Sequence, residues 1–151
     1  MRIAIEDPRT DDVSQLLAEH LQNMREISPP ESVHALNIED LLRPEVTFWT
    51  AREHGALLGC AALKCLSPIH GEIKSMRTPF RKRRIGAGRK LLEHIIEEAR
   101  ARAYTRLSLE TGSMAEFLPA RALYESVGFK PCAPFGEYRL DPNSVFMSLA
   151  L

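Results

Sequence analysis

Hydrophobic and polar positions follow two different periods along the chain, and the changes of period divide it into segments. Apolar residues at three- and four-residue intervals predict helices over 13–24, 35–42, from about Gly86 to 103, and 114–127. Alternating or β-branched stretches predict strands over 2–5, 46–53, 57–65, 72–77, 106–110 and 145–151. Two of these strands form a β-hairpin, because His54-Gly55 predicts a turn. The order of elements indicates an α+β fold in which helices sandwich a mixed sheet.

The size and charge of the chain narrow its class. Its 151 residues, 44% of them hydrophobic, suffice for one core, so we expect a single domain over 1–151. Twenty basic and twenty acidic side chains cancel, which argues against nucleic acid or an anionic membrane as a partner. No signal-like run is present, and no stretch approaches the roughly 20 apolar residues of a membrane helix. We therefore expect a cytoplasmic protein.

The cysteines give no sign of a metal or a disulfide framework. Cys60, Cys65 and Cys132 are odd in number and show no Cys-x-x-Cys spacing. This pattern predicts buried free thiols and no metal site.

Residues 81–90 combine charge and glycine in a way that suits a phosphate. Six of these ten residues are basic, and two glycines open the long helix directly after a strand. Helix N-termini present unpaired amides, and glycine lets an anion approach the backbone. The spacing excludes a Rossmann motif, which needs a third glycine, and a P-loop, which needs Gly-Lys-Ser/Thr. The alternatives are an ordinary basic helix start and a nucleic-acid footprint, although the segment lacks interleaved stacking aromatics.

Two motifs resemble one known family. Arg83, Gly86 and Gly88 match the Gln/Arg-x-x-Gly-x-Gly/Ala pyrophosphate loop of the GNAT acetyltransferase superfamily, and residues 120–129 resemble its Ala-x-x-Leu-Tyr-x-x-x-Gly-Phe segment. The order of predicted elements agrees over nearly the whole chain. Phe117 departs from the pattern, since the family often has there an asparagine that contacts the pantetheine arm. The resemblance implies a three-layer α/β/α sandwich with a mixed, mostly antiparallel sheet, and acetyl transfer from acetyl-CoA to an amine.

The resemblance also assigns roles to individual residues. Glu72 matches a strand glutamate that is the general base in some members, and Tyr124 matches a tyrosine that protonates the CoA thiolate. A surface carboxylate beside Lys74 and a core tyrosine are the structural alternatives. The cofactor-binding residues that it implies are Met76, Arg77, Thr78, Arg83, Arg84, Ile85, Gly86, Ala87, Gly88 and Arg89.

Recognition of the acceptor is expected where three segments meet in the family, here 25–34, 111–114 and 138–144. The substrate-binding candidates are His34, Arg77, Thr111, Ser113 and Tyr138. Arg77 suits a substrate carboxylate, whereas a lone loop histidine such as His34 is more often solvated.

The leading hypothesis is an enzyme that uses acetyl-CoA and a small-molecule amine, with no metal. A protein or peptide N-acetyltransferase is the alternative within the same chemistry, and a non-catalytic acyl-CoA-binding sensor is the alternative outside it. A homodimer is left open, because Phe146, Met147 and Leu149 suit either an interface or the core.

Overall fold

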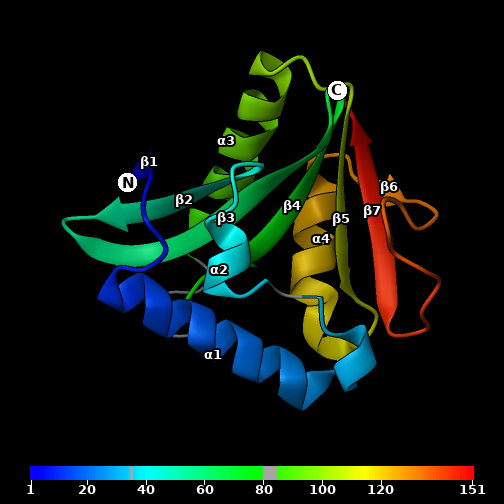
Figure 1. The fold of residues 1–151 in the computed structure, drawn as a ribbon, viewed down its shortest axis with the longest axis horizontal. Helices are drawn as coiled ribbons and strands as arrows, with labels where there is room; N and C mark the ends of the chain where they lie inside the picture. Colours follow the sequence, from blue (N-terminus) through cyan, green and yellow to red (C-terminus); the bar gives the residue numbers. More distant parts are fainter. Residues whose placement is uncertain (35, 80–84) are drawn as a thin grey trace.

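A seven-stranded sheet runs through the computed structural model, which describes residues 1–34, 36–79 and 85–151 (Figure 1). Its order is β1-β2-β3-β4-β5-β7-β6, and only β4 and β5 are parallel neighbours. The strands are β1 (Arg2–Ile5), β2 (Val46–Glu53), β3 (Ala56–Ser67), β4 (His70–Arg77), β5 (Arg106–Gly112), β6 (Lys130–Pro131) and β7 (Ser144–Ala150). The predicted mixed, mostly antiparallel sheet is thus confirmed.

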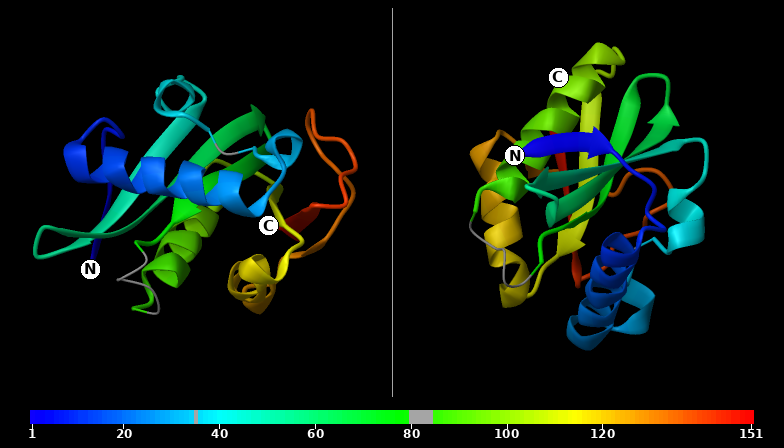
Figure 2. Two further views of the ribbon diagram at one scale, coloured as in Figure 1. Left: turned by 90° about the horizontal axis from the view of Figure 1, so that it is seen from below. Right: turned by 90° about the vertical axis from the view of Figure 1, so that its left-hand side faces the viewer.

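Helices cover both faces of this sheet, as Figure 2 shows. The long helix α3 (Ala87–Ala101) and α4 (Leu118–Ser126) lie on one face, and the larger core cluster is built beneath α3. On the other face, α1 (Asp11–Ile27) and the short α2 (Ile38–Leu41) bury a smaller cluster against β2 and β3. These layers form the predicted three-layer α/β/α sandwich.

Two predicted helices differ from the structure near prolines and caps. The segment 114–127 is divided into a 3-10 turn, η3 (Ala115–Phe117), and α4, because Pro119 lacks an amide hydrogen and is accommodated only in the first turn of a helix. The helix predicted over 35–42 is shortened to α2, where the Asn37 side chain accepts a 2.8 Å hydrogen bond from the Asp40 amide. A 3-10 turn, η1 (Pro30–Ser32), follows α1.

The pairing of β4 with β5 covers only the first half of β4. It runs from His70 and Arg106 to Ile73 and Leu109, and beyond this point Figure 1 shows the two strands diverging. A bulge in β4 accompanies the divergence: between Lys74 and Arg77, β4 has one more residue than β3 has opposite it, and Ser75 takes a left-handed φ of 53°. The sheet therefore opens in its middle, between parallel strands.

The hydrophobic residues of β7 belong to the core. Phe146 is 5% exposed and Met147 is fully buried, while Leu149 packs partly buried against the larger cluster. Since β7 lies between β5 and β6, it is not an edge strand. The core explanation of these three residues is therefore the one that the structure supports.

All three cysteines are free, but only Cys60 is buried. The prediction of burial is wrong for Cys65 and Cys132, which are partly exposed. Cys65 lies near the end of β3 and Cys132 directly after the short β6, where fewer elements cover the chain. In the described parts of the chain, no helix has the length and apolarity needed to cross a membrane.

Candidate active site

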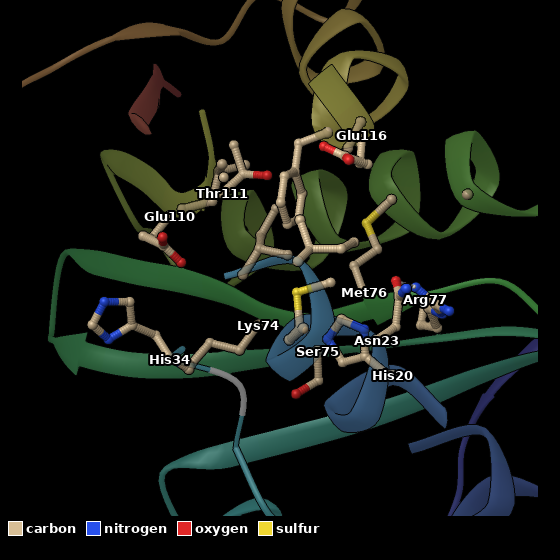
Figure 3. A pocket seen from close by; sticks show the side chains of 18 of the residues that line it. His20, Asn23, His34, Lys74, Ser75, Met76, Arg77, Glu110, Thr111 and Glu116 are labelled. Atoms are coloured by element: carbon tan, nitrogen blue, oxygen red, sulfur yellow. Dashed lines mark hydrogen bonds between the residues drawn. The ribbon is translucent and has the colours of Figure 1, made fainter. Parts of the chain in front are cut away.

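A cavity of about 1180 Å³ opens where β4 and β5 diverge (Figure 3). Its walls come from α1, the segment after α1, β4, the start of α3, β5 and α4. It is lined by twelve of the predicted site residues: His34, Glu72, Met76, Arg77, Thr78, Gly86, Ala87, Gly88, Arg89, Thr111, Tyr124 and Tyr138. Residues that are far apart in the sequence thus share one space.

The remaining predicted site residues do not line the cavity or cannot be placed. Ser113 donates a 2.7 Å hydrogen bond to the carbonyl of Pro142, so its hydroxyl joins the end of β5 to the loop before β7. Ile85 is 48% exposed and lies beside the cavity rather than in its wall. Arg83 and Arg84 lie outside the described residues.

One end of the cavity, here called the helix end, is formed by Gly86–Arg89 and Met76–Thr78. Gly86 is the N-cap of α3 with a φ of +93°, and a β-carbon added there would meet nothing within 4 Å. The glycine is therefore required by the backbone conformation and not by crowding from the protein. The unpaired amides and partial positive charge at the start of this 15-residue helix suit a phosphate.

The middle of the cavity contains Tyr124 on α4, which is 8% exposed. Burial, and secondarily the charge of Glu110, raises the pKa of the Tyr124 phenol to about 12. The hydroxyl is thus protonated at neutral pH and is able to donate a proton. Tyr124 also belongs to the larger core cluster, so it packs in the core and lines the cavity at the same time, and its catalytic role stays a prediction.

Phe117 gives this part of the wall an apolar surface. Its ring lies directly over Gly112, where an added β-carbon would collide with the ring. Gly112 is thus required by the close approach of Phe117. A phenyl ring cannot make the hydrogen bonds of an amide, so the pantetheine contact that an asparagine makes in some family members is not expected from Phe117.

The opposite end, here called the carboxylate end, is lined by Glu72, Lys74, Glu110, His34 and Tyr138. The Tyr138 hydroxyl donates a 2.5 Å hydrogen bond to Oε2 of Glu72 and accepts a 2.7 Å bond from Nζ of Lys74. Nζ of Lys74 also lies 3.3 Å from Oε2 of Glu72. Glu72 is only 3% exposed, so the alternative of a surface carboxylate is wrong.

Glu110 is a site residue that the sequence analysis missed. Its Oε2 accepts a 2.7 Å hydrogen bond from the Ser144 hydroxyl of β7. Burial raises the pKa of Glu110 to about 7, against the lowering effects of the Ser144 hydrogen bond and the charge of Lys74. A signal was present in the sequence, because the alternation of β5 puts Ser108 and Glu110 on one face of an otherwise largely apolar strand.

Two loops meet across the carboxylate end. The hydroxyl of Ser32 in η1 donates a 2.6 Å hydrogen bond to Oδ2 of Asp141, and the amide of the Asn143 side chain donates to the Ser32 oxygen at 3.4 Å. Nearby, the rings of His34 and Tyr138 pack edge to face with centroids 5.0 Å apart. The segment after α1 is thus joined to the loop before β7, which restricts access from this side.

Arg77 is held by α1 rather than left free. Its Nη1 donates to the Asn23 side chain at 3.0 Å, and its Nη2 donates to Glu19 at 3.2 Å. The side chain is 9% exposed. The predicted contact of Arg77 with a substrate carboxylate would have to compete with these partners, and it stays a prediction.

The opened sheet brings together a helix N-terminus suited to phosphate, a buried tyrosine and two carboxylates. This combination indicates the class of protein, an acyl-CoA-dependent transferase. Comparison with known sequences gives the family. The model of the acetyltransferase (GNAT) family matches residues 11–129. This chain therefore belongs to the GNAT family, and it is an acetyl-CoA-dependent N-acetyltransferase.

Relatives and solved structures agree with this assignment. The chain is 57% identical to the uncharacterized N-acetyltransferase YsnE of Bacillus subtilis (strain 168), over 100% of both chains. It is 39% identical to a protein of Azospirillum brasilense named IAA acetyltransferase, over 99% of this chain and 97% of the other. A candidate acyl-CoA N-acyltransferase of Klebsiella pneumoniae has a similar structure, with a TM-score of 0.77, 28% identity, and coverage of 99% and 97%.

A Bacillus subtilis acetyltransferase in complex with CoA shares the fold as well. Its TM-score is 0.76 at 20% identity, with 99% of this chain and 98% of the other covered. The expected fold is therefore found in a structure that contains CoA.

Proposed function

We propose that the enzyme transfers an acetyl group from acetyl-CoA to a primary amine of a small molecule, by direct attack in a ternary complex. The observation that carries the proposal is that one cavity has a phosphate-suited helix start at one end and hydrogen-bonded carboxylates at the other. The two substrates would meet in its middle, where β4 and β5 diverge.

Acetyl-CoA would occupy the helix end. The backbone of Gly86–Arg89, with Arg83 and Arg84 beside it in the sequence, would hold the pyrophosphate. Met76 and Thr78 would pair their backbone with the pantetheine amides, as an added strand does. A backbone amide near Met76 would polarise the thioester oxygen, because β5 leaves this part of β4 unpaired.

Transfer then requires a neutral amine and a protonated leaving group. An alkyl ammonium has a pKa of about 10.4, so a base must take a proton before the nitrogen can attack. Glu72 is the base predicted from the sequence, and the cavity supplies a second carboxylate in Glu110. Tyr124 would donate its proton to the CoA thiolate as the carbon–sulfur bond breaks.

Direct attack is supported by the composition of the cavity wall. Among the described residues that line the cavity there is no cysteine, so no thiol is placed to carry the acetyl group on the enzyme. With the two substrates at the two ends of one cavity, the nitrogen of the acceptor would attack the thioester itself.

A small acceptor is favoured by the bridge between Ser32 and Asp141. This bridge joins two loops across the carboxylate end, so a folded polypeptide would have to separate them in order to reach Glu72 or Glu110. A protein or peptide acceptor would be better served by an open groove.

The test measures acetyl-CoA binding by calorimetry and then CoA release with a panel of acceptors. The panel would contain primary amines, short peptides with free N-termini, and IAA, the compound in the name of one relative. Binding together with CoA release that depends on a small amine supports the proposal. Faster release with peptides would contradict the small acceptor, and failure to bind acetyl-CoA would contradict the assignment of the helix end.

A further inference from the structure

The two carboxylates at the carboxylate end differ in how far their oxygens are already occupied. Oε2 of Glu72 receives hydrogen bonds from both Tyr138 and Lys74, and the residue is 3% exposed. Glu110 has one such partner among the described residues, Ser144, which bonds to Oε2. Oε1 has no hydrogen-bond partner among the described residues in either carboxylate, so the two differ at Oε2: Glu72 is bound there by the Lys74 cation, whereas Glu110 is bound only by a neutral hydroxyl.

The position of Glu110 in the sheet also suits proton transfer. It directly follows Leu109, the last residue of β5 that pairs with β4, so it stands where the cavity begins. Figure 3 shows its carboxylate pointing from β5 into the space that His34 and Lys74 also face. Tyr124 lines the same cavity, and the charge of Glu110 contributes, after burial, to the raised pKa of its phenol.

We infer that Glu110 is the general base that deprotonates the acceptor ammonium, and that Ser144 is a positioning residue that holds its carboxylate. The inference rests on the proposed acetyl transfer. Glu72 then has a different role: it holds Tyr138 and Lys74, which shape the carboxylate end.

The protons balance over the reaction. The ammonium gives one proton to Oε1 of Glu110, and the neutral nitrogen attacks the thioester carbon to form the carbon–nitrogen bond. The carbon–sulfur bond breaks, and the thiolate takes the proton of Tyr124. The attacking nitrogen carries a positive charge once the carbon–nitrogen bond has formed; it gives its extra proton to the phenolate and becomes the neutral amide, and Glu110 releases its proton to solvent.

The surroundings of Glu110 give it an affinity for protons that suits this role. The charged and titratable groups around it are Glu72 and Lys74 on β4, Tyr124 on α4, and His34, Tyr138 and Asp141 in the loops. Burial dominates and raises the pKa of Glu110 to about 7. Below this pH the carboxyl is protonated and cannot accept a proton, so kcat/KM should rise with pH through about 7.

The experiment compares pH profiles of kcat/KM for wild type, Glu110→Gln and Glu72→Gln, with the best amine of the panel. Glu110→Gln should lower kcat/KM by about 100-fold or more and abolish its rise near neutral pH. The kcat/KM of this variant should then rise only at the higher pH where the amine itself loses its proton. Acetyl-CoA affinity should be unchanged, because the helix end is intact. Glu72→Gln should keep the rise but move it to lower pH, because the charge of Glu72 contributes to the raised pKa of Glu110.

The positioning role of Ser144 has its own readout. Its hydrogen bond lowers the pKa of Glu110, so Ser144→Ala should move the rise in kcat/KM to higher pH. Ser148→Ala is the matched control, because Ser148 is on the same strand but its hydroxyl accepts a hydrogen bond from Arg106 and not from a carboxyl group. This control should leave the midpoint where it is in wild type.

Three outcomes would overturn the inference. A Glu110→Gln enzyme that keeps the wild-type profile would exclude the base role while leaving the acetyl transfer intact. If the rise of kcat/KM near neutral pH is lost in Glu72→Gln but kept in Glu110→Gln, the general base is Glu72. A wild type that binds acetyl-CoA but turns over no amine would contradict the proposed function, and the role of Glu110 with it.

Discussion

The helix end and the carboxylate end of the cavity are built in different ways. At the helix end, a continuous segment, Gly86–Arg89, offers mainly backbone amides, and its key glycine is required by a φ of +93°. At the carboxylate end, side chains arrive from β4, β5 and two loops, and they are held by hydrogen bonds between residues up to 111 positions apart. A short motif can therefore specify the first end, whereas only the folded chain assembles the second.

The two ends therefore rely on different kinds of groups, backbone amides at the helix end and side chains at the carboxylate end. Backbone amides at a helix start can bind any phosphate that comes within hydrogen-bond distance, whatever the neighbouring side chains are. The carboxylate end consists of hydrogen-bonded side chains, and under the proposed function these are the groups that would contact the amine. Substitutions at the two ends should consequently affect different kinetic parameters.

The largest effect is expected where the two ends meet. Tyr124→Phe should lower kcat by about 100- to 10,000-fold, because the CoA thiolate loses its proton donor, while the affinity for acetyl-CoA stays nearly unchanged. Single-turnover kinetics and calorimetry measure the two quantities. Unchanged turnover in this variant would exclude the role of general acid.

At the helix end, Gly86→Val should raise the Kd for acetyl-CoA by about 100-fold, equivalent to two lost charge-assisted hydrogen bonds. The matched control is Gly55→Val, because Gly55 also has a positive φ, of 80°, and open space around it, but it lies in the turn between β2 and β3. Both variants should lose similar stability in thermal unfolding, and only Gly86→Val should lose affinity. Retained affinity in Gly86→Val would refute the assignment of the helix end.

At the carboxylate end, Tyr138→Phe should raise KM for the amine by about tenfold, since it removes the hydroxyl that joins Glu72 to Lys74. Acetyl-CoA affinity should not change. Tyr104→Phe is the control, because Tyr104 is similarly aromatic, 7% exposed, and belongs to the core cluster rather than to the cavity wall. An equal change of KM in both variants would indicate a general loss of stability instead.

The smallest effect is expected from Ser32→Ala, which removes the bridge to Asp141. KM for a small amine should rise by about threefold, and peptide amines should become better acceptors relative to small ones. Competition assays with one small amine and one short peptide measure this ratio. A ratio equal to that of wild type would show that the bridge does not select acceptor size.

The sequence predicted most of the fold because the signals that carry it are local. The periodicity of residues 87–101 predicted α3, and alternation or β-branching predicted six of the seven strands. It failed where a short element depends on a partner: the two-residue strand β6 exists only through its pairing with β7. It also extended a helix over 114–117, although Pro119 limits where α4 begins.

For the site, the sequence by itself determined the helix end, the place of Tyr124 and the presence of Glu72, since each lies within or beside a motif of adjacent residues. Tertiary structure decided that Glu110 faces the cavity, that Ser144 holds it, and that Ser113 turns away to Pro142. The burial that raises the pKa of Glu110 comes from elements distant in the chain, and so does the bridge between Ser32 and Asp141. Burial and hydrogen bonds between distant residues leave no local pattern in the sequence, so the chemistry of the carboxylate end becomes readable only when the chain is folded.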